Sequence, residues 1–131
     1  MYHLTENQER IIALQMHLNN ELTELDDDYL VLTDEEADEK AKEYILDSLW
    51  SFHPNFLASA TGIDSEVFEA IQGNGRYESN NDAILRLVDD EDALVEEAIS
   101  WVGRGHFLSH YDGEENSATV NGTEYFIYRQ N

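Results

Sequence analysis

The sequence predicts an α+β fold, in which a helical N-terminal two-thirds packs on a small C-terminal three-stranded antiparallel β-sheet. Two observations support this class. As far as Val102, apolar residues recur at the spacings of three and four that are typical of amphipathic helices. Beyond Gly103 the chain changes to short β-rich runs, two of which flank Asn121-Gly122. With 131 residues, 41% of them hydrophobic, residues 1–131 are expected to form one domain.

The first expected element is a helix within residues 1–25. Thr5 and Gln8 form a capping-box pattern, which is typical of a helix N-terminus. One face of this helix would be apolar, through Ile11, Leu14, Leu18, Leu22 and Leu25. We expect it to be peripheral to the rest of the domain. Three aspartates follow it, and Tyr29 to Leu32 is a candidate for a short extended segment.

Residues 26–102 are expected to form the helical part of the domain. Thr33 and Glu36 make a second capping box. The helix that follows would carry an apolar side composed of Ala37, Ala41, Tyr44, Ile45, Ser48, Leu49 and Phe52. His53-Pro54 is expected to end this helix, because the residue before a proline disfavours helical geometry.

Shorter helices are expected after this point, each delimited by capping residues or glycines. They are Asn55 to Ala60 closed by Gly62, Ser65 to Gln72 between Asp64 and Gly73, and Asp82 to Val88. The last predicted helix runs from Glu91 to Val102 and stops at Gly103. It would bury Leu94, Val95, Ala98, Ile99, Trp101 and Val102.

Residues 103–131 are predicted to form a β-meander of three strands. The candidate strands are Phe107 to Tyr111, Ala118 to Val120 and Thr123 to Tyr128. Asn121-Gly122 suits a type I′ turn, which needs positive φ at both central positions. Asp112-Gly113-Glu114 is expected to turn between the first two strands. Such a small sheet must bury one face against the helices to be stable.

The charge of the chain is its most informative property for function. It has 29 acidic and seven basic residues, a formal net charge of −22. Duplex DNA carries one charge per about 1.7 Å of axis, so the same charge occupies about 37 Å of duplex. A compact domain of this length has a diameter of roughly 35 Å. The chain therefore carries the charge of a DNA segment of its own length, although solubility and salt adaptation are alternative reasons for an acidic surface.

The acidic residues concentrate in two stretches of sequence. Glu21 to Asp47 contains twelve acids and two lysines, and Asp82 to Glu97 contains seven acids and one arginine. In the first stretch Glu36, Glu39, Glu43 and Asp47 would form a row opposite the apolar side of one helix, continued by Trp50. The residues of the two stretches that we expect to bind a partner are Glu36, Glu39, Glu43, Asp47, Trp50, Asp89, Asp90, Glu91, Asp92 and Glu96. The alternative is an ordinary solvated helix face, with Trp50 packed against another element.

Patterns typical of catalytic or metal sites are weak. No cysteine is present, and no loop has the oxygen-ligand spacing of a Ca²⁺ site, so no cofactor and no metal are expected. His106 and His110 would lie about 13 Å apart in a strand, too far to share an ion. Gly103-Arg104-Gly105-His106 would leave a helix and enter a strand, which is not the setting of a phosphate loop. We therefore expect no enzyme.

The same composition restricts partners and location. Seven scattered basic residues disfavour direct nucleic-acid binding. No secretion signal or membrane-spanning run is recognised, so a cytoplasmic protein is expected, as a monomer or homodimer that does not contact membranes.

Several short stretches resemble small, uncharacterised acidic proteins of bacteriophages and related mobile elements. They are Tyr29-Leu-Val-Leu-Thr-Asp-Glu-Glu-Ala-Asp, Gly103-Arg-Gly-His-Phe-Leu-Ser, Tyr111-Asp-Gly-Glu-Glu and Tyr125-Phe-Ile-Tyr-Arg. The resemblance covers about Leu25 to Arg129 and implies a phage setting, without catalytic residues. In charge and size alone, the chain also resembles the DNA mimics that act as antirestriction or anti-CRISPR inhibitors.

These observations predict a non-enzymatic phage inhibitor that acts as an acidic DNA mimic in the host cytoplasm. It would occupy the basic nucleic-acid-binding channel of a defence complex, either a CRISPR (Cas) effector or a restriction enzyme, whose channel binds polyanions through Lys and Arg. The alternative is a phage accessory protein that regulates another protein through an apolar patch, without DNA mimicry.

Overall fold

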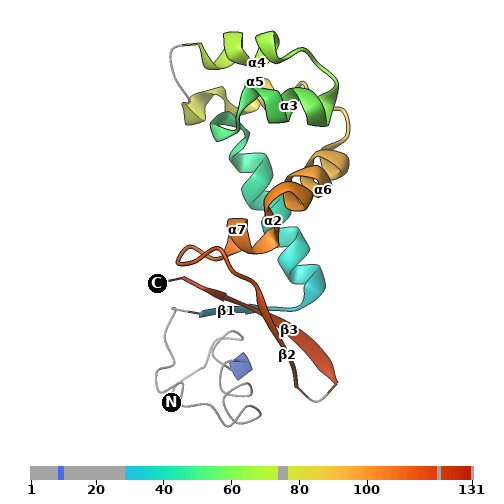
Figure 1. The fold of residues 1–131 in the computed structure, drawn as a ribbon, viewed down its shortest axis with the longest axis vertical. Coiled ribbons are helices and arrows are strands. Elements are labelled where there is room, and N and C mark those ends of the chain that lie inside the picture. Colours follow the sequence, from blue (N-terminus) through green and yellow to red (C-terminus); the bar gives the residue numbers. More distant parts are fainter. Residues whose placement is uncertain (1–8, 11–28, 74–76, 121, 131) are drawn as a thin grey trace. The chain divides into compact units, whose positions relative to one another are not determined.

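The computed structural model describes residues 9–10, 29–73, 77–120 and 122–130, and it confirms the α+β class (Figure 1). The chain divides into two compact units. Unit 1 comprises Met1–Lys40 and Arg104–Asn131, and unit 2 comprises Ala41–Gly103. The boundary falls inside helix α2 (Asp34–Asp47). The capping box at Thr5 and the apolar face predicted for residues 11–25 lie outside the described residues.

Unit 1 contains the sheet, which has three antiparallel strands in the order β1-β3-β2 (Figure 1). The strands are β1 (Tyr29–Leu32), β2 (Asn116–Val120) and β3 (Thr123–Arg129). The predicted hairpin is confirmed, because Val120 pairs with Thr123 across a two-residue connection in which Gly122 has a φ of +83°. Asn121 lies outside the described residues.

The prediction of a strand over Phe107 to Tyr111 is wrong. Arg104–Leu108 forms helix α7, and the backbone N–H of Ser109 donates to the carbonyl of Gly105 at 2.8 Å. A Cβ atom on Gly105 would stand 2.7 Å from the carbonyl oxygen of Gly113, so this turn of helix packs directly on backbone that only glycine can approach. Gly103 therefore separates α6 from α7, whereas Gly105 lies within α7. The third strand comes instead from Tyr29–Leu32, which pairs with the far edge of β3.

Helix α2 begins as predicted. The backbone N–H of Thr33 donates to Glu36 Oε1 at 2.9 Å, and the N–H of Glu36 donates to Thr33 Oγ1 at 3.4 Å, which completes the capping box. The buried positions of the helix and of the 3₁₀ turn η1 (Leu49–Ser51) are Ala37, Ala41, Ile45 and Leu49. Tyr44 was predicted to be buried, but 44% of it is exposed.

Unit 2 is helical, and most of its predicted boundaries are confirmed. Its α-helices after α2 are α3 (Pro54–Thr61), α4 (Ser65–Gln72), α5 (Asn81–Leu85), which follows the 3₁₀ turn η2 (Glu78–Asn80), and α6 (Glu91–Val102). Gly62 and Gly103 have φ values of +76° and +86°, as expected for residues that stop helices. The prediction of a helix to Val88 is wrong, because α5 ends at Leu85.

Two amide side chains hold the turns of unit 2 together. The buried Gln72 donates from Nε2 to the carbonyls of Trp50 at 3.2 Å and Phe52 at 2.9 Å. Asn81 donates from Nδ2 to the carbonyl of Leu46 at 2.8 Å and accepts from the N–H of Trp50 at 3.1 Å. The prediction that this helix runs to His53-Pro54 is wrong, because α2 ends at Asp47, and these bonds satisfy backbone groups in the turns that follow it. Pro54 instead opens α3, with His53 as its N-cap.

The buried face of α6 is narrower than predicted. Leu94, Val95 and Ala98 are buried, in agreement with the helical spacing. Trp101 and Val102, in the last turn, are 61% and 50% exposed, so the prediction that they are core residues is wrong.

Candidate functional site

The four acids predicted to form a row on α2 differ in their contacts, because the carboxylate of Glu36 pairs with Arg10. Its carboxylate accepts hydrogen bonds from Arg10, at 2.5 Å from Nη1 and 3.2 Å from Nη2. These bonds, together with the N–H of Thr33, lower the pKa of Glu36 to about 2. The Arg10 guanidinium also donates to the carbonyl of Val31 at 3.0 Å and lies over the ring of Tyr125. Glu36 therefore ties α2 to the sheet of unit 1 and is not available as a free acidic group.

The rest of the row is exposed. Glu39, Glu43 and Asp47 are exposed to solvent on α2. The ion pairs described above and below for this structure are formed by other carboxylates. Asp47 is the last residue of α2, and the last turn has no basic residue. A carboxylate there opposes the helix dipole, which costs about 0.3–1 kcal/mol. The fold itself does not explain this charge.

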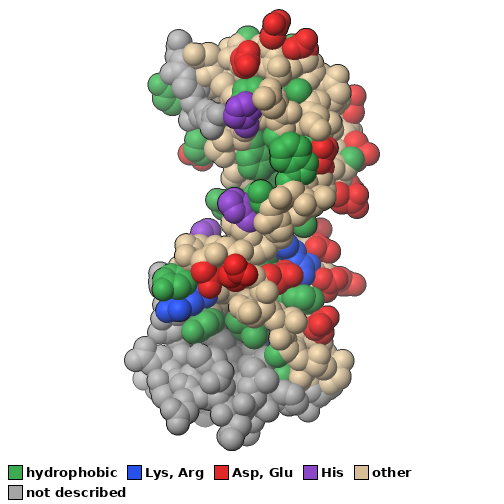
Figure 2. All heavy atoms as spheres, viewed as in Figure 1, with side chains coloured by type: hydrophobic (Ala, Val, Ile, Leu, Met, Phe, Trp, Pro, Cys, Tyr) green, Lys and Arg blue, Asp and Glu red, His purple; other side chains and the backbone are tan. Residues whose placement is uncertain are grey.

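The second predicted patch lies in unit 2 and is linked to α2 by an ion pair. Lys42 Nζ stands 2.8 Å from Asp92 Oδ1, which joins α2 to the first turn of α6. This contact brings residues 50 positions apart together. Asp89, Asp90, Glu91, Asp92 and Glu96 are all exposed. Figure 2 shows acidic side chains along the edge of unit 2 where α6 begins.

We define the unit 2 acidic surface as the predicted partner-binding acids of unit 2, all of them exposed: Glu43, Asp47, Asp89, Asp90, Glu91, Asp92 and Glu96. Some of these charges have structural reasons. Asp90 caps α6 by accepting from the N–H of Ala93 at 3.0 Å, and Glu91 and Asp92 lie in the first turn, where the helix dipole favours acids. Asp47 and Glu96 are neither N-cap residues nor members of a first helical turn.

Trp50 is partly buried. Its backbone is held in η1 by Asn81 and Gln72, and its side chain is neither fully enclosed nor widely exposed. This placement leaves both predicted roles open, as a packing residue and as a contact for a partner.

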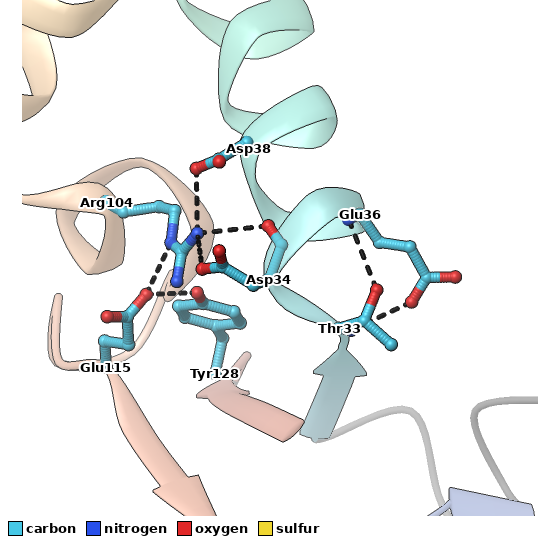
Figure 3. Close-up of polar contacts among 7 residues, drawn as sticks. All are labelled: Thr33, Asp34, Glu36, Asp38, Arg104, Glu115 and Tyr128. Carbon is cyan, nitrogen blue, oxygen red and sulfur yellow. Dashed lines mark hydrogen bonds and ion pairs between the residues drawn. The ribbon is translucent and has the colours of Figure 1, made fainter. Parts of the chain in front are cut away.

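Sequence reasoning missed an arginine cluster in unit 1 (Figure 3). Arg104 on α7 donates from Nε to Glu115 at 2.7 Å and from Nη1 to Asp34 and Asp38 at 2.8 Å each. Only 10% of its side chain is exposed, and the guanidinium lies over the ring of Phe126. The cluster thus joins α7, the start of α2 and the residues before β2.

Contacts within this cluster shift the pKa values of Arg104 and Tyr128. Burial alone would lower the pKa of Arg104, but the bonds to Glu115, Asp34 and Asp38 outweigh burial and raise it above its usual value. The buried Tyr128 donates its hydroxyl to Glu115, and burial together with this bond raises the pKa of Tyr128. Arg104 therefore stays charged and Tyr128 stays neutral at neutral pH. Such a saturated cluster favours a structural role over catalysis.

The histidines do not form a site in the described part of the chain. His106 lies on α7, not in a strand, and its ring packs at the edge of Phe107. Among the described residues, no group of three or more His, Cys, Asp or Glu side chains is placed to hold a metal ion. Within the same residues, no helix has the length and apolar character needed to cross a membrane.

Two signals in the sequence could have identified the missed residues. Arg104 is one of only seven basic residues in a very acidic chain, so an ion-pair network around it was to be expected. Trp101 directly precedes the end of a helix, where core burial is less certain than in the middle. Neither signal indicates which carboxylates or rings are the partners, since those come from distant segments.

Comparison with models of protein families, with curated proteins and with solved structures found no match for this chain. The resemblance to acidic phage proteins therefore stays a prediction.

Proposed function

We propose that this protein is a non-enzymatic inhibitor that mimics the charge of DNA and occupies the basic nucleic-acid-binding channel of another protein. The proposed target is a host defence complex, a CRISPR effector or a restriction enzyme, in the cytoplasm of a phage-infected cell. The unit 2 acidic surface is the part of the chain that would contact the Lys and Arg residues of the channel.

The observation that carries this proposal is the Lys42–Asp92 contact. It joins Lys42 of α2 to the first turn of α6, so that the two acidic stretches, distant in sequence, are linked by an ion pair, which supports a shared acidic surface. Within unit 2 the sequence has thirteen acids and three basic residues, and Lys42 is already paired within the surface. A dense carboxylate surface with few internal cations raises the rate of association with a basic partner.

The energetic cost of the charges also supports a binding role. Asp47 opposes the dipole of α2, and neighbouring acids on a helix cost a few tenths of a kcal/mol per pair. The whole chain, at −22, is further destabilised by self-repulsion. Charges that reduce the stability of the fold are expected where they stabilise a complex instead.

The proposal is tested by neutralising the surface in matched sets. The partner is first recovered from host lysate by pull-down and identified by mass spectrometry. The test variant then carries Glu43→Gln, Asp47→Asn, Asp89→Asn and Glu96→Gln. The control variant removes four exposed acids of unit 2 that lie on α4, η2 and α5, namely Glu66, Glu69, Glu78 and Asp82. Both variants have the same net charge.

We expect the test variant to bind the partner at least tenfold more weakly than the control variant, with each substitution contributing part of the loss. Equal affinities would mean that only net charge matters and that this surface is not the contact. Loss of all binding through one carboxylate would indicate a catalytic or metal-binding group and would contradict a charge mimic.

A second candidate function is regulation of another protein through an apolar patch. The exposure of Trp101 and Val102 on α6 favours it, because large apolar side chains next to each other on a surface are typical of contact sites. Binding that is equally strong at about 0.1 M and about 0.5 M salt would support this function over mimicry.

A further inference from the structure

The surface of unit 2 contains an aromatic group that the acidic surface defined above does not include. Trp101, on the last turn of α6, is 61% exposed, the largest exposure among the large hydrophobic side chains of the described residues. A tryptophan this exposed loses favourable burial, so its position calls for a specific reason.

The indole is held in place from one side. Its ring packs at 83° against Phe56 of α3, with the ring centroids 5.3 Å apart. Phe56 is itself buried and packs at 90° against Phe52, again at 5.3 Å. This aromatic series restricts the indole, while most of its surface remains in solvent. A side chain ordered before binding loses less entropy when a partner contacts it.

A carboxylate lies next to the indole on the same helix face. Glu97 is four residues before Trp101 on α6, a spacing that places the two side chains about 5–6 Å apart at Cβ. The hydroxyl of Ser59 on α3 donates to Glu97 Oε1 at 2.8 Å and fixes its direction. A carboxylate has about four acceptor sites, so this bond leaves room for a further donor. Figure 1 shows α3 and α6, which carry these residues, side by side.

We propose that Trp101 and Glu97 form a docking site for an arginine side chain of a protein partner. A guanidinium stacks on the face of an indole and donates paired hydrogen bonds to a carboxylate, whereas the compact ammonium of lysine does the first less well and cannot do the second. The charge of unit 2 favours a basic segment over a neutral one. This inference rests on the proposed function and adds the residue type that the partner presents.

The test uses fluorescently labelled nine-residue peptides of arginine and of lysine, titrated into the full-length protein at low salt. We expect the arginine peptide to bind at least threefold more tightly than the lysine peptide. Trp101→Leu, which keeps an apolar contact with Phe56, should reduce this ratio to about one, and Trp101→Phe should retain part of it. Glu97→Gln should weaken arginine binding more than Glu69→Gln, a matched change at an exposed acid of α4.

A second readout isolates the indole. In a Trp50→Phe variant, Trp101 is the sole tryptophan, so its emission should change on titration with the arginine peptide and change less with the lysine peptide. An unchanged emission would contradict stacking. Thermal unfolding of each variant shows whether the fold is retained, and Trp101→Leu should leave the midpoint nearly constant because the side chain is mostly exposed.

The outcomes separate this inference from the proposed function. If both peptides bind equally to the wild type and to Trp101→Leu, charge-driven binding stands and the arginine site is wrong. If neither peptide binds even at low salt, the proposed function fails as well. If Trp101→Leu weakens both peptides by the same factor, the tryptophan is an apolar contact without preference for arginine, which also overturns the inference.

Discussion

At the scale of single residues, three basic side chains of the described chain hold parts of the fold together. Arg10 binds Glu36, Lys42 binds Asp92, and Arg104 binds three carboxylates. In a chain of net charge −22, each such contact offsets part of the repulsion between acids. Removing a cation should therefore cost more than removing an acid.

Arg104→Ala tests this asymmetry. The arginine side chain is almost fully buried, but its partners Asp34 and Asp38 are largely exposed and can be rehydrated. We therefore expect a loss of about 2–3 kcal/mol in the free energy of unfolding, less than the 3–5 kcal/mol typical when a fully buried pair is broken. Urea denaturation measures it. Arg86→Ala, which removes an exposed arginine of α5's C-terminal end, should change stability by less than about 0.5 kcal/mol; equal losses would contradict the structural role of Arg104.

Glu36 gives a prediction for acidic pH. Its pKa is lowered to about 2 by Arg10 and Thr33, so its stabilising contribution is complete above the usual value of about 4.5 and is lost as the pH falls to about 2. Glu36→Gln keeps the capping box but removes the ion pair with Arg10. The difference in unfolding free energy between wild type and variant should shrink across this range. Glu35→Gln is the control, and a difference for Glu36→Gln that does not vary with pH would contradict the ion pair.

At the scale of elements, α2 combines a well-formed N-terminus with an unfavourable C-terminal half. Its first turn has acids and a capping box, whereas its last turn contains Asp47 and no base. Stability and function should therefore respond in opposite ways to substitutions in this half.

The triple variant Glu39→Gln, Glu43→Gln, Asp47→Asn tests that opposition. Removing like charges from one exposed helix face should leave the melting temperature unchanged or raise stability by several tenths of a kcal/mol. Affinity for the recovered partner should fall, by about 1 kcal/mol for each charge that meets a desolvated Lys or Arg. Trp50→Ala is measured alongside, since a packing role would lower the melting temperature and a contact role would lower affinity alone. A destabilised triple variant, or one with unchanged affinity, would exclude this face.

Local signals in the sequence predicted much of this level of structure. Capping residues and glycines located α4 and α6 at their observed bounds, and the Asn121-Gly122 pair located the hairpin, because these features act over a few residues. The pairing of Tyr29–Leu32 with β3 could not be predicted, since it joins segments about 100 residues apart. The constraint on Gly105 also depends on folded contacts, because it comes from the backbone of Gly113 to Glu115, which packs against this turn of α7.

The candidate site also contains both features that local sequence predicts and features that depend on tertiary contacts. The exposure of Asp89, Asp90, Glu91, Asp92 and Glu96 follows from their charge and was predicted. The pairing of Glu36 with Arg10 and the exposure of Trp101 depend on tertiary neighbours. The helical period gave no sign of the ion pair and wrongly predicted that Trp101 is buried.

At the scale of the whole molecule, net charge governs how far and how strongly the protein attracts a basic partner. The on-rate of a charge mimic should fall steeply as salt rises from about 0.05 to about 0.5 M, because the Debye length shrinks from roughly 14 Å to roughly 4 Å over this range. Stopped-flow or surface-plasmon measurements would report it. A flat salt dependence would favour the apolar-patch alternative.

Competition with DNA tests DNA mimicry most directly. The partner recovered from host lysate is loaded with this protein, and a duplex DNA that the partner binds is titrated into the complex. Mimicry predicts mutually exclusive binding, so that the apparent affinity for this protein falls in proportion to the DNA added. A ternary complex in which the partner holds the DNA and this protein together, each at full affinity, would contradict the proposal.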